Sequence, residues 1–307
     1  MDEPAEAAAK PAREAWKRLR RDRAAVAGLV VLFLVLIAAV VGPILLPADS
    51  AALTKNQFAE PSTRHPFGTD LLGRDVLYRV LEGARISLLV GFSGACISLF
   101  VGVAYGLVAG YSGGKRDAVM MRGVEVLYAI PRLIIVLIFI NAFNTTLARW
   151  FQDVGLAALV GYSRVVILVF SLGLIEWLTM ARIVRGQVLA LKSLQFVDAA
   201  RSLGQTHAKI ILRHLLPNLA GIIVVYLTLT IPAVILDESF LSFLGLGIQP
   251  PQASWGVLLS DGAQVINPVR SYWWLLAFPA AAMSITLLSL NFLGDGLRDA
   301  LDPRERR

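Results

Sequence analysis

The sequence contains little cysteine, little histidine and little charge. Cys96 is the only cysteine among 307 residues, which excludes an internal disulfide and a secreted disulfide scaffold. His65, His207 and His214 have no cysteine or carboxylate at ligand spacing, so we predict no metal site. Charged residues form 17% of the chain and hydrophobic residues 56%, whereas soluble domains carry about 25% charged residues. The composition excludes an ordinary soluble protein.

Motifs for nucleotide hydrolysis and nucleic-acid binding are also missing. A Walker A loop requires Gly-x-x-x-x-Gly-Lys followed by Ser or Thr. At the only Gly-Lys pair, Gly114-Lys115, Ala109 replaces the first glycine and Arg116 replaces the hydroxyl residue. The net charge is +7, but no basic segment alternates with stacking aromatic residues. We therefore predict no catalytic residue, no cofactor bound by this chain and no nucleic-acid partner.

Long apolar runs dominate what is present. Four runs contain no Asp, Glu, Lys or Arg, and they cover residues 24–48, 86–114, 214–236 and 271–294. Each is long enough to cross a bilayer as a helix, which takes about 20 residues. The first run is too long for a signal peptide, whose apolar region has about 7 to 15 residues. Two further spans, at about 118–143 and 159–180, contain charges but keep solid apolar blocks. We predict an all-α integral membrane protein with six transmembrane helices.

Five charged residues fall within the two charged spans, and Arg122 lies near the start of the first. The other four are Glu125, Arg132, Arg164 and Glu176, and intramembrane charges are functional candidates by default. Glu125 and Arg132 are seven residues apart, which predicts that they share one helix face. Pro131 lies between the charged and apolar halves of its span, so a kink or a helix start is expected there. Pairing within the protein explains these charges as well as substrate contact does, and no substrate-binding residue is assigned.

Lys and Arg are unevenly distributed among the connections. The N-terminal tail and the connection after the fourth span are heavily basic, whereas the third and fifth connections contain only Arg149 and Arg270. The first outer connection is an exception, but its acidic residues balance most of its basic ones. Cytoplasmic loops are enriched in Lys and Arg, so both termini are predicted to be cytoplasmic. The predicted organisation is a cytoplasmic basic tail at 1–23, a first transmembrane helix at 24–46, an outer segment at 47–85, a five-helix core at 86–294 with a connection at 185–217, and a cytoplasmic tail at 295–307.

Small residues recur at every fourth position of the second span. They are Gly94, Ser98, Gly102, Gly106 and Gly110. Such a ridge lets another helix approach closely in lipid, so it predicts a packing seam within this subunit or against a partner subunit. The alternative is that glycine is simply common in membrane helices.

The connection at 185–217 does not resemble an ordinary loop. Val188, Leu191, Leu194 or Gln195, and Asp198 recur at helical spacing, which predicts an amphipathic helix. Ala199 and Ala200 make a smooth patch, Gly204 allows a sharp turn, and Pro217 opens the next span. Such a helix fits a groove on a partner protein, and the alternative is an amphipathic helix lying on lipid.

These residues resemble a known motif. Asp198-Ala199-Ala200, Gly204 and Leu216-Pro217 are similar to the EAA loop of ABC importer permeases, the coupling helix that docks on the ATPase subunit. Aspartate stands where that pattern usually has glutamate. Three further stretches are similar to the peptide and nickel permease family, on the side of its dipeptide and oligopeptide C-type subunit. They are 65–75 with 83–88, 241–251 with 254–256, and 291–304.

The resemblance implies a type I ABC importer permease in the bacterial cytoplasmic (inner) membrane. It implies four partners in a complex: a second homologous permease, two ABC ATPase subunits that use ATP and Mg, and an extracytoplasmic substrate-binding protein. The implied cargo is a di- or oligopeptide, with nickel or glutathione as alternatives. An ion-coupled secondary transporter remains a further alternative, although no internal repeat is visible. Pro131, Pro232 and Pro279 are expected to break three spans, which argues against a purely structural scaffold.

The segment 237–270 is expected to be neither a spanning helix nor a plain loop. It is rich in Gly and Pro, yet it contains Phe240, Phe243, Leu244 and Trp255. We expect it to lie in the membrane interface or to re-enter the membrane partway. It would cap the translocation path or meet a binding protein, and the alternative is a rigid lid that closes the bundle.

Overall fold

The computed structural model describes residues 16–46, 52–266 and 270–301, and this part of the chain is helical with no strand. It contains six helices that are long and apolar enough to cross a membrane, in agreement with the predicted number. The long helices are α2 (Arg23–Leu45), α3 (Val76–Ser112), α5 (Arg132–Asp153), α6 (Ser163–Leu191), α9 (Leu216–Phe243) and α11 (Trp274–Leu301). The predicted tail residues 1–15 and 302–307 lie outside the described residues.

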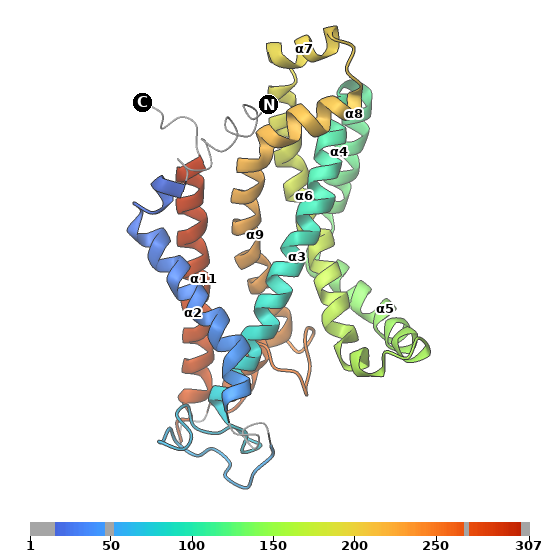
Figure 1. The fold of residues 1–307 in the computed structure, drawn as a ribbon. Helices are drawn as coiled ribbons and strands as arrows, with labels where there is room; N and C mark the ends of the chain where they lie inside the picture. Colours follow the sequence, from blue (N-terminus) through green and yellow to red (C-terminus); the bar gives the residue numbers. More distant parts are fainter. Residues whose placement is uncertain (1–15, 47–51, 267–269, 302–307) are drawn as a thin grey trace.

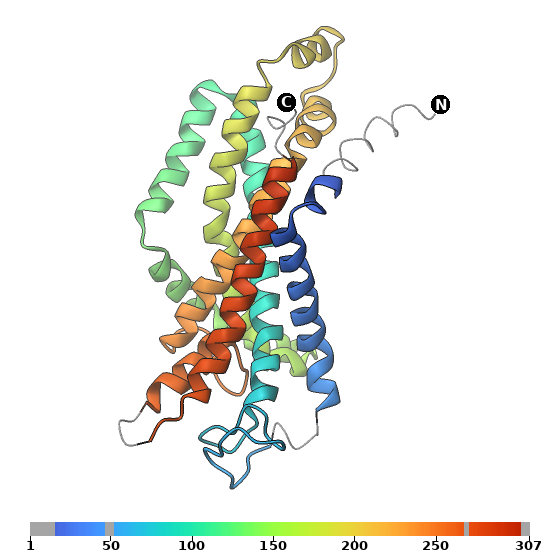
Figure 2. The same ribbon diagram turned by 90° about the vertical axis from the view of Figure 1, so that its left-hand side faces the viewer.

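The long helices form one elongated bundle around α3. Helix α3 packs against both α6 and α9, while α2 and α11 run side by side (Figure 1 and Figure 2). The short elements are α4 (Gly114–Ala129), a 3-10 turn η2 (Ala157–Tyr162), α7 (Gln195–Ser202), α8 (His207–Ile210), a π-helical turn η3 (Ile211–Leu215) and α10 (Trp255–Gln264). Helix α7 lies beyond one end of the bundle, together with the start of α2 and the end of α11 (Figure 1). We call this the α7 end, and the other end, which carries residues 52–75, the opposite end.

Helix α3 begins at Val76, ten residues before the predicted start of the second span at residue 86. Asp75 caps the helix, because its carboxylate accepts a hydrogen bond from the backbone N–H of Tyr78 at 3.1 Å. Arg79, in the first turn, is only 4% exposed and donates to the carboxylates of Asp70 at 3.0 Å and Asp261 at 2.9 Å. Arg79, which was predicted to lie in the outer segment 47–85, is therefore part of a helix and paired inside the fold.

The third predicted span is two helices rather than one. Helix α4 ends at Ala129, Ile130 is extended as residues before proline usually are, and α5 starts after Pro131. The expected helix start at Pro131 is confirmed. The prediction that Glu125 and Arg132 share a helix face is wrong, because this break separates them. The expectation that Pro232 and Pro279 break their spans is also wrong, since α9 and α11 continue through both prolines.

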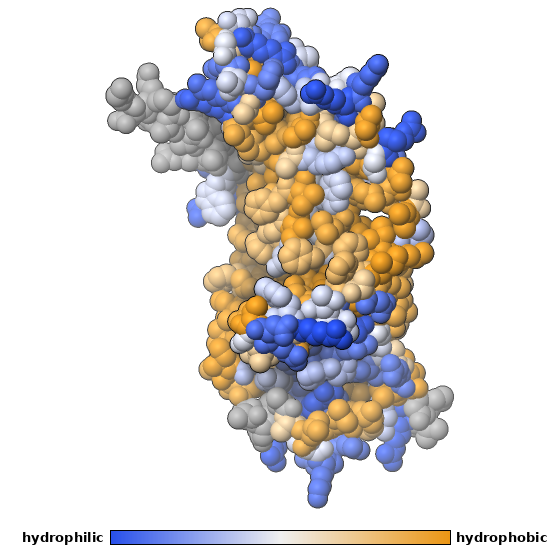
Figure 3. Space-filling view, turned by 90° about the vertical axis from the view of Figure 1, so that its right-hand side faces the viewer, coloured by the Kyte–Doolittle hydropathy of each residue, from blue (hydrophilic) through white to orange (hydrophobic). Residues whose placement is uncertain are grey.

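The outer face of the bundle is largely apolar. Large hydrophobic side chains are exposed along most of the long helices, among them Phe33, Phe92 and Phe170. In Figure 3, hydrophobic residues cover much of the middle of one face, and hydrophilic residues gather towards both ends. A surface of this kind is expected where helices meet lipid.

The segment expected to be irregular from residue 237 is partly regular. Helix α9 continues to Phe243, so its first seven residues are helical. Helix α10 then folds back against α9 and α11. Trp255 is fully buried, and its indole N–H donates to the backbone carbonyl of Val80 at 3.2 Å. The described part of this segment, residues 237–266, therefore packs into the bundle at the opposite end.

Candidate functional site

Helix α7 presents one face to the protein and one to the outside. Val197 and Ala200 are buried, in one hydrophobic cluster with Ile210 and Leu215. Asp198 and Ala199 are exposed, and among the described residues the Asp198 carboxylate accepts a hydrogen bond from Arg201 alone, at 3.2 Å. The two alanines therefore do not form one patch, because Ala200 packs inwards and Ala199 faces outwards.

The predicted amphipathic helix is interrupted. Val188 and Leu191 belong to α6, and Leu194 is extended before α7 begins at Gln195. The helical spacing continues in the sequence across this break, which is why a single helix was expected. The break turns α7 away from the axis of α6 (Figure 1).

Gly204 ends α7 with a sharp turn. Its φ of +74° lies in the left-handed region, which disfavours residues with a Cβ. The backbone N–H of Gln205 then donates to the carbonyl of Ala200 at 3.1 Å, which closes the turn. Leu216 and Pro217 occupy the first turn of α9, where Leu216 is half-buried and Pro217 is exposed.

Ionic and polar contacts join the end of α6, just before α7, to α4 and α3. Arg185 of α6 binds Asp117 of α4 through two hydrogen bonds, of 2.6 and 2.7 Å. These hydrogen bonds lower the pKa of the Asp117 carboxyl below its ordinary value. Lys192, just after α6, donates to the backbone carbonyl of Gly110 at 2.8 Å. No sequence pattern indicated the Asp117–Arg185 pair, because 68 positions separate its members.

The small-residue ridge of α3 lies mainly against α6 of the same chain. A Cβ built on Gly102 would lie 2.5 Å from Met180 Cβ, and one on Gly106 would lie 2.6 Å from the Ala181 carbonyl oxygen. A Cβ on Gly110 would similarly meet Val188, at 2.8 Å. At the other end of the ridge, Gly94 faces Val234 of α9, and Ser98 is fully buried.

A cluster of three charges lies where α5, α6 and α9 meet. One nitrogen of Arg132, Nη1, donates to Glu176 Oε1 at 3.3 Å and to Asp237 Oδ2 at 3.1 Å. The cluster unites two of the predicted intramembrane charges with Asp237, which sequence reasoning missed because it placed Asp237 outside the spans. Of the other two, Glu125 pairs with Arg122 at 3.8 Å, and Arg164 donates to the Leu246 carbonyl at 3.0 Å.

A fully buried carboxyl group was also missed. Glu238 is fully buried and accepts hydrogen bonds from Ser242 at 2.7 Å, Ser87 at 3.0 Å and Ser239 at 3.3 Å. These contacts join α3 to the end of α9. Glu238 directly follows Asp237 and so lies about 100° around the helix from it, and the sequence contains no signal that Glu238 would be the buried one. Within the described residues, no three His, Cys, Asp or Glu side chains converge on a position that could hold a metal.

Comparison with known proteins agrees with this architecture. Residues 102–307 match the family model described as binding-protein-dependent transport system inner membrane component. The chain belongs to this family. Residues 10–62 of the permease also match the model of the N-terminal TM domain of oligopeptide transport permease C. Its six long apolar helices have the type I ABC importer permease fold.

Curated relatives cover almost the whole permease. It is 46% identical to the dipeptide transport system permease protein DppC of Bacillus subtilis (strain 168), over 96% of this chain and 86% of the relative. It is 43% identical to the oligopeptide transport system permease protein OppC of Haemophilus influenzae, over 95% of this chain and 88% of the relative. The OppC protein of Escherichia coli (strain K12) is 42% identical, over 95% and 91%. The permease is a multi-pass inner membrane transport component rather than an enzyme.

Proposed function

We propose that the permease is the C-type membrane subunit of an ATP-driven importer for di- or oligopeptides. The observation that carries this proposal is the similarity, over nearly the full chain, to proteins named as dipeptide and oligopeptide permeases. In the complex, it pairs with a second homologous permease, two ABC ATPases and an extracytoplasmic binding protein. ATP and Mg are used by the ATPases, and this chain supplies the membrane path.

The outward face of α7 is proposed as the contact with an ATPase. Asp198 and Ala199 supply an exposed, small and acidic surface, while Ala200 holds the helix to the bundle. Gly204 sets the angle of the turn, and Leu216-Pro217 begins the helix that receives the movement. The α7 end is then cytoplasmic, as is each terminus. Closure of the ATPases would push α7 and shift the bundle between inward-open and outward-open states.

Transport by the purified complex in proteoliposomes tests this proposal. We expect Ala199→Trp to abolish dipeptide uptake, because a large side chain on the outward face prevents the ATPase from docking. The matched control is Ala142→Trp, at an exposed position of α5, a helix that lies far from α7 (Figure 1), and it should leave uptake near the wild-type rate. Normal uptake by Ala199→Trp would contradict the coupling role of α7. Uptake of nickel but not dipeptide by the wild type, or dipeptide uptake without ATPases, would contradict the proposed function itself.

A further inference from the structure

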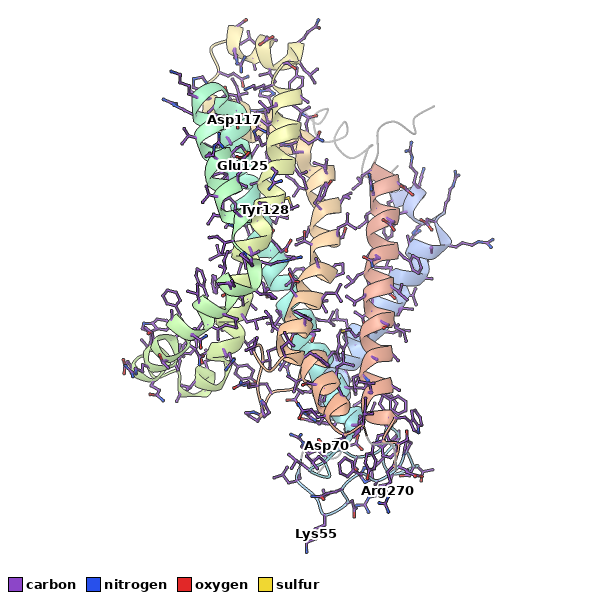
Figure 4. All side chains as sticks on the ribbon, turned by 180° about the vertical axis from the view of Figure 1, so that it is seen from behind. Lys55, Asp70, Asp117, Glu125, Tyr128 and Arg270 are labelled. Carbon is purple, nitrogen blue, oxygen red and sulfur yellow. The ribbon has the colours of Figure 1, made fainter. Side chains whose placement is uncertain are left out.

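Polar side chains that are exposed or half-buried follow one another along α4, α5, α6 and α9. On α6 they recur at every third residue, at Glu176, Thr179 and Arg182, and so lie on one side of the helix. Tyr128 of α4 bonds to the Thr179 hydroxyl at 2.5 Å, and the Arg182 guanidinium lies 4.0 Å from the centre of the Tyr128 ring. Figure 4 shows Tyr128 on the part of α4 that leads away from Asp117, towards the middle of the bundle.

The charged cluster continues this line into the centre of the membrane-spanning region. Glu176 lies near the middle of α6, about 20 Å from either end at 1.5 Å per residue. Its side chain is too short to reach an interface from there. The Arg132 side chain is 59% exposed, although it is flanked by Glu176 and Asp237. Ionised groups are costly in hydrocarbon, so this face does not border lipid.

The contacts within the cluster leave hydrogen-bonding capacity free. Arg132 uses Nη1 for both of its ion pairs with described residues, so Nε and Nη2 can donate to another group. Each carboxylate meets Arg132 through one oxygen, and its second oxygen can accept another donor. Two negative groups share one positive group. The cluster is therefore suited to a ligand that carries both an ammonium and a carboxylate.

We propose that Tyr128, Arg132, Glu176, Thr179, Arg182 and Asp237, here called the polar track, border the water-filled path along which a peptide crosses the membrane. Glu176 and Asp237 bind the terminal ammonium of the passing peptide, and Arg132 binds its terminal carboxylate. The two ion pairs of Arg132 measure 3.1 and 3.3 Å and are partly exposed. The peptide termini can therefore replace them, with the ammonium taking the place of Arg132 and the carboxylate taking the place of Glu176 and Asp237. This inference rests on the proposed function, and it assigns that function to particular side chains.

Thiol modification tests whether the track is in contact with water. Cys96→Ala removes the single native cysteine, and Thr179→Cys then places one thiol on the track. The control is Phe170→Cys, which is exposed on the apolar part of α6. In the complete reconstituted complex, we expect a charged, membrane-impermeant methanethiosulfonate to modify Cys at 179 at least tenfold faster than at 170. Equal rates would overturn the inference, and so would protection of position 179 by a permanently seated partner subunit.

Uptake kinetics test whether the cluster contacts the peptide. We expect the double variant Glu176→Gln/Asp237→Asn to raise the KM for a dipeptide at least tenfold relative to its effect on N-acetylated dipeptide, which lacks the ammonium. Glu125→Gln is the matched control, because this exposed carboxylate of α4 pairs with Arg122 outside the cluster. An equal effect on both peptides, or no effect, would overturn the inference. Wild-type dipeptide uptake in the same vesicles checks the proposed function separately, since its absence would contradict that proposal whatever the variants do.

Discussion

Replacing Asp117 by Asn tests how α4 is joined to α6. In the wild type, Asp117 and Arg185 share two hydrogen bonds of 2.6 and 2.7 Å, with side chains that are 8% and 32% exposed. Breaking a fully buried ion pair costs about 3–5 kcal/mol, and an exposed pair contributes about 0–1 kcal/mol. Because Arg185 keeps partial access to water, we expect Asp117→Asn to lower the free energy of unfolding by about 2 kcal/mol.

The pH dependence of this loss identifies its cause. The pKa of Asp117 is lowered in the folded state by its hydrogen bonds with Arg185, so its stabilisation is complete above the unfolded pKa of about 4. The stabilisation disappears as the pH falls through the lowered pKa. The difference in stability between the wild type and Asp117→Asn should be constant from about pH 5 to 8 and shrink below about pH 4.

Denaturation of the purified permease, followed by intrinsic tryptophan fluorescence over this pH range, measures both effects. Glu125→Gln on the same helix is the control, because its ion pair with Arg122 is 3.8 Å long and its side chain is 62% exposed. We expect that control to change stability by less than about 0.5 kcal/mol. The reasoning is refuted if Asp117→Asn is as stable as the wild type at pH 7, or if the difference grows as the pH falls.

Three other substitutions test packing and backbone geometry. Gly106→Ala should destabilise the permease by about 2 kcal/mol in thermal unfolding, because its Cβ would lie 2.6 Å from a backbone oxygen. Gly186→Ala should not destabilise the permease, because a Cβ at that position would lie in open space. Equal stability of the two variants would refute the close packing of α3 against α6. Gly204→Ala should lower peptide-stimulated ATP hydrolysis severalfold, because the φ of +74° at this position disfavours a residue with a Cβ. Unchanged hydrolysis would contradict a role of the Gly204 turn in coupling. Glu238→Leu should cost about 3 kcal/mol in the same unfolding assay, since three serine hydroxyls lose their acceptor; a neutral result would contradict that account.

Local signals in the sequence predicted local features well. The charge-free runs predicted the four clean spans, because crossing hydrocarbon demands length and apolar composition within one segment. Pro131 predicted a helix start, since proline removes a backbone donor and restricts the residue before it. The same rule failed for Pro232 and Pro279, whose helices continue through both prolines.

Features that join distant segments were not predicted. The Arg132 cluster takes its carboxylates from α6 and α9, and Arg79 in the first turn of α3 pairs with Asp261, 182 residues away. The two alanines of α7 look equivalent in the sequence, yet one packs against Ile210 and the other is exposed. The spacing of residues along α7 does not tell which alanine is buried. That depends on the segment around Ile210, which packs against one side of the helix.

By itself, the sequence determined that the chain is a six-span membrane protein, where the four charge-free helices lie, and which family it resembles. Those properties depend on composition and on residues close together in the chain. Only the tertiary structure decided which charges meet within the membrane, which face of α7 is free, and which helix covers the glycine ridge. Those properties depend on contacts between helices, and the contacts exist only after the bundle has packed.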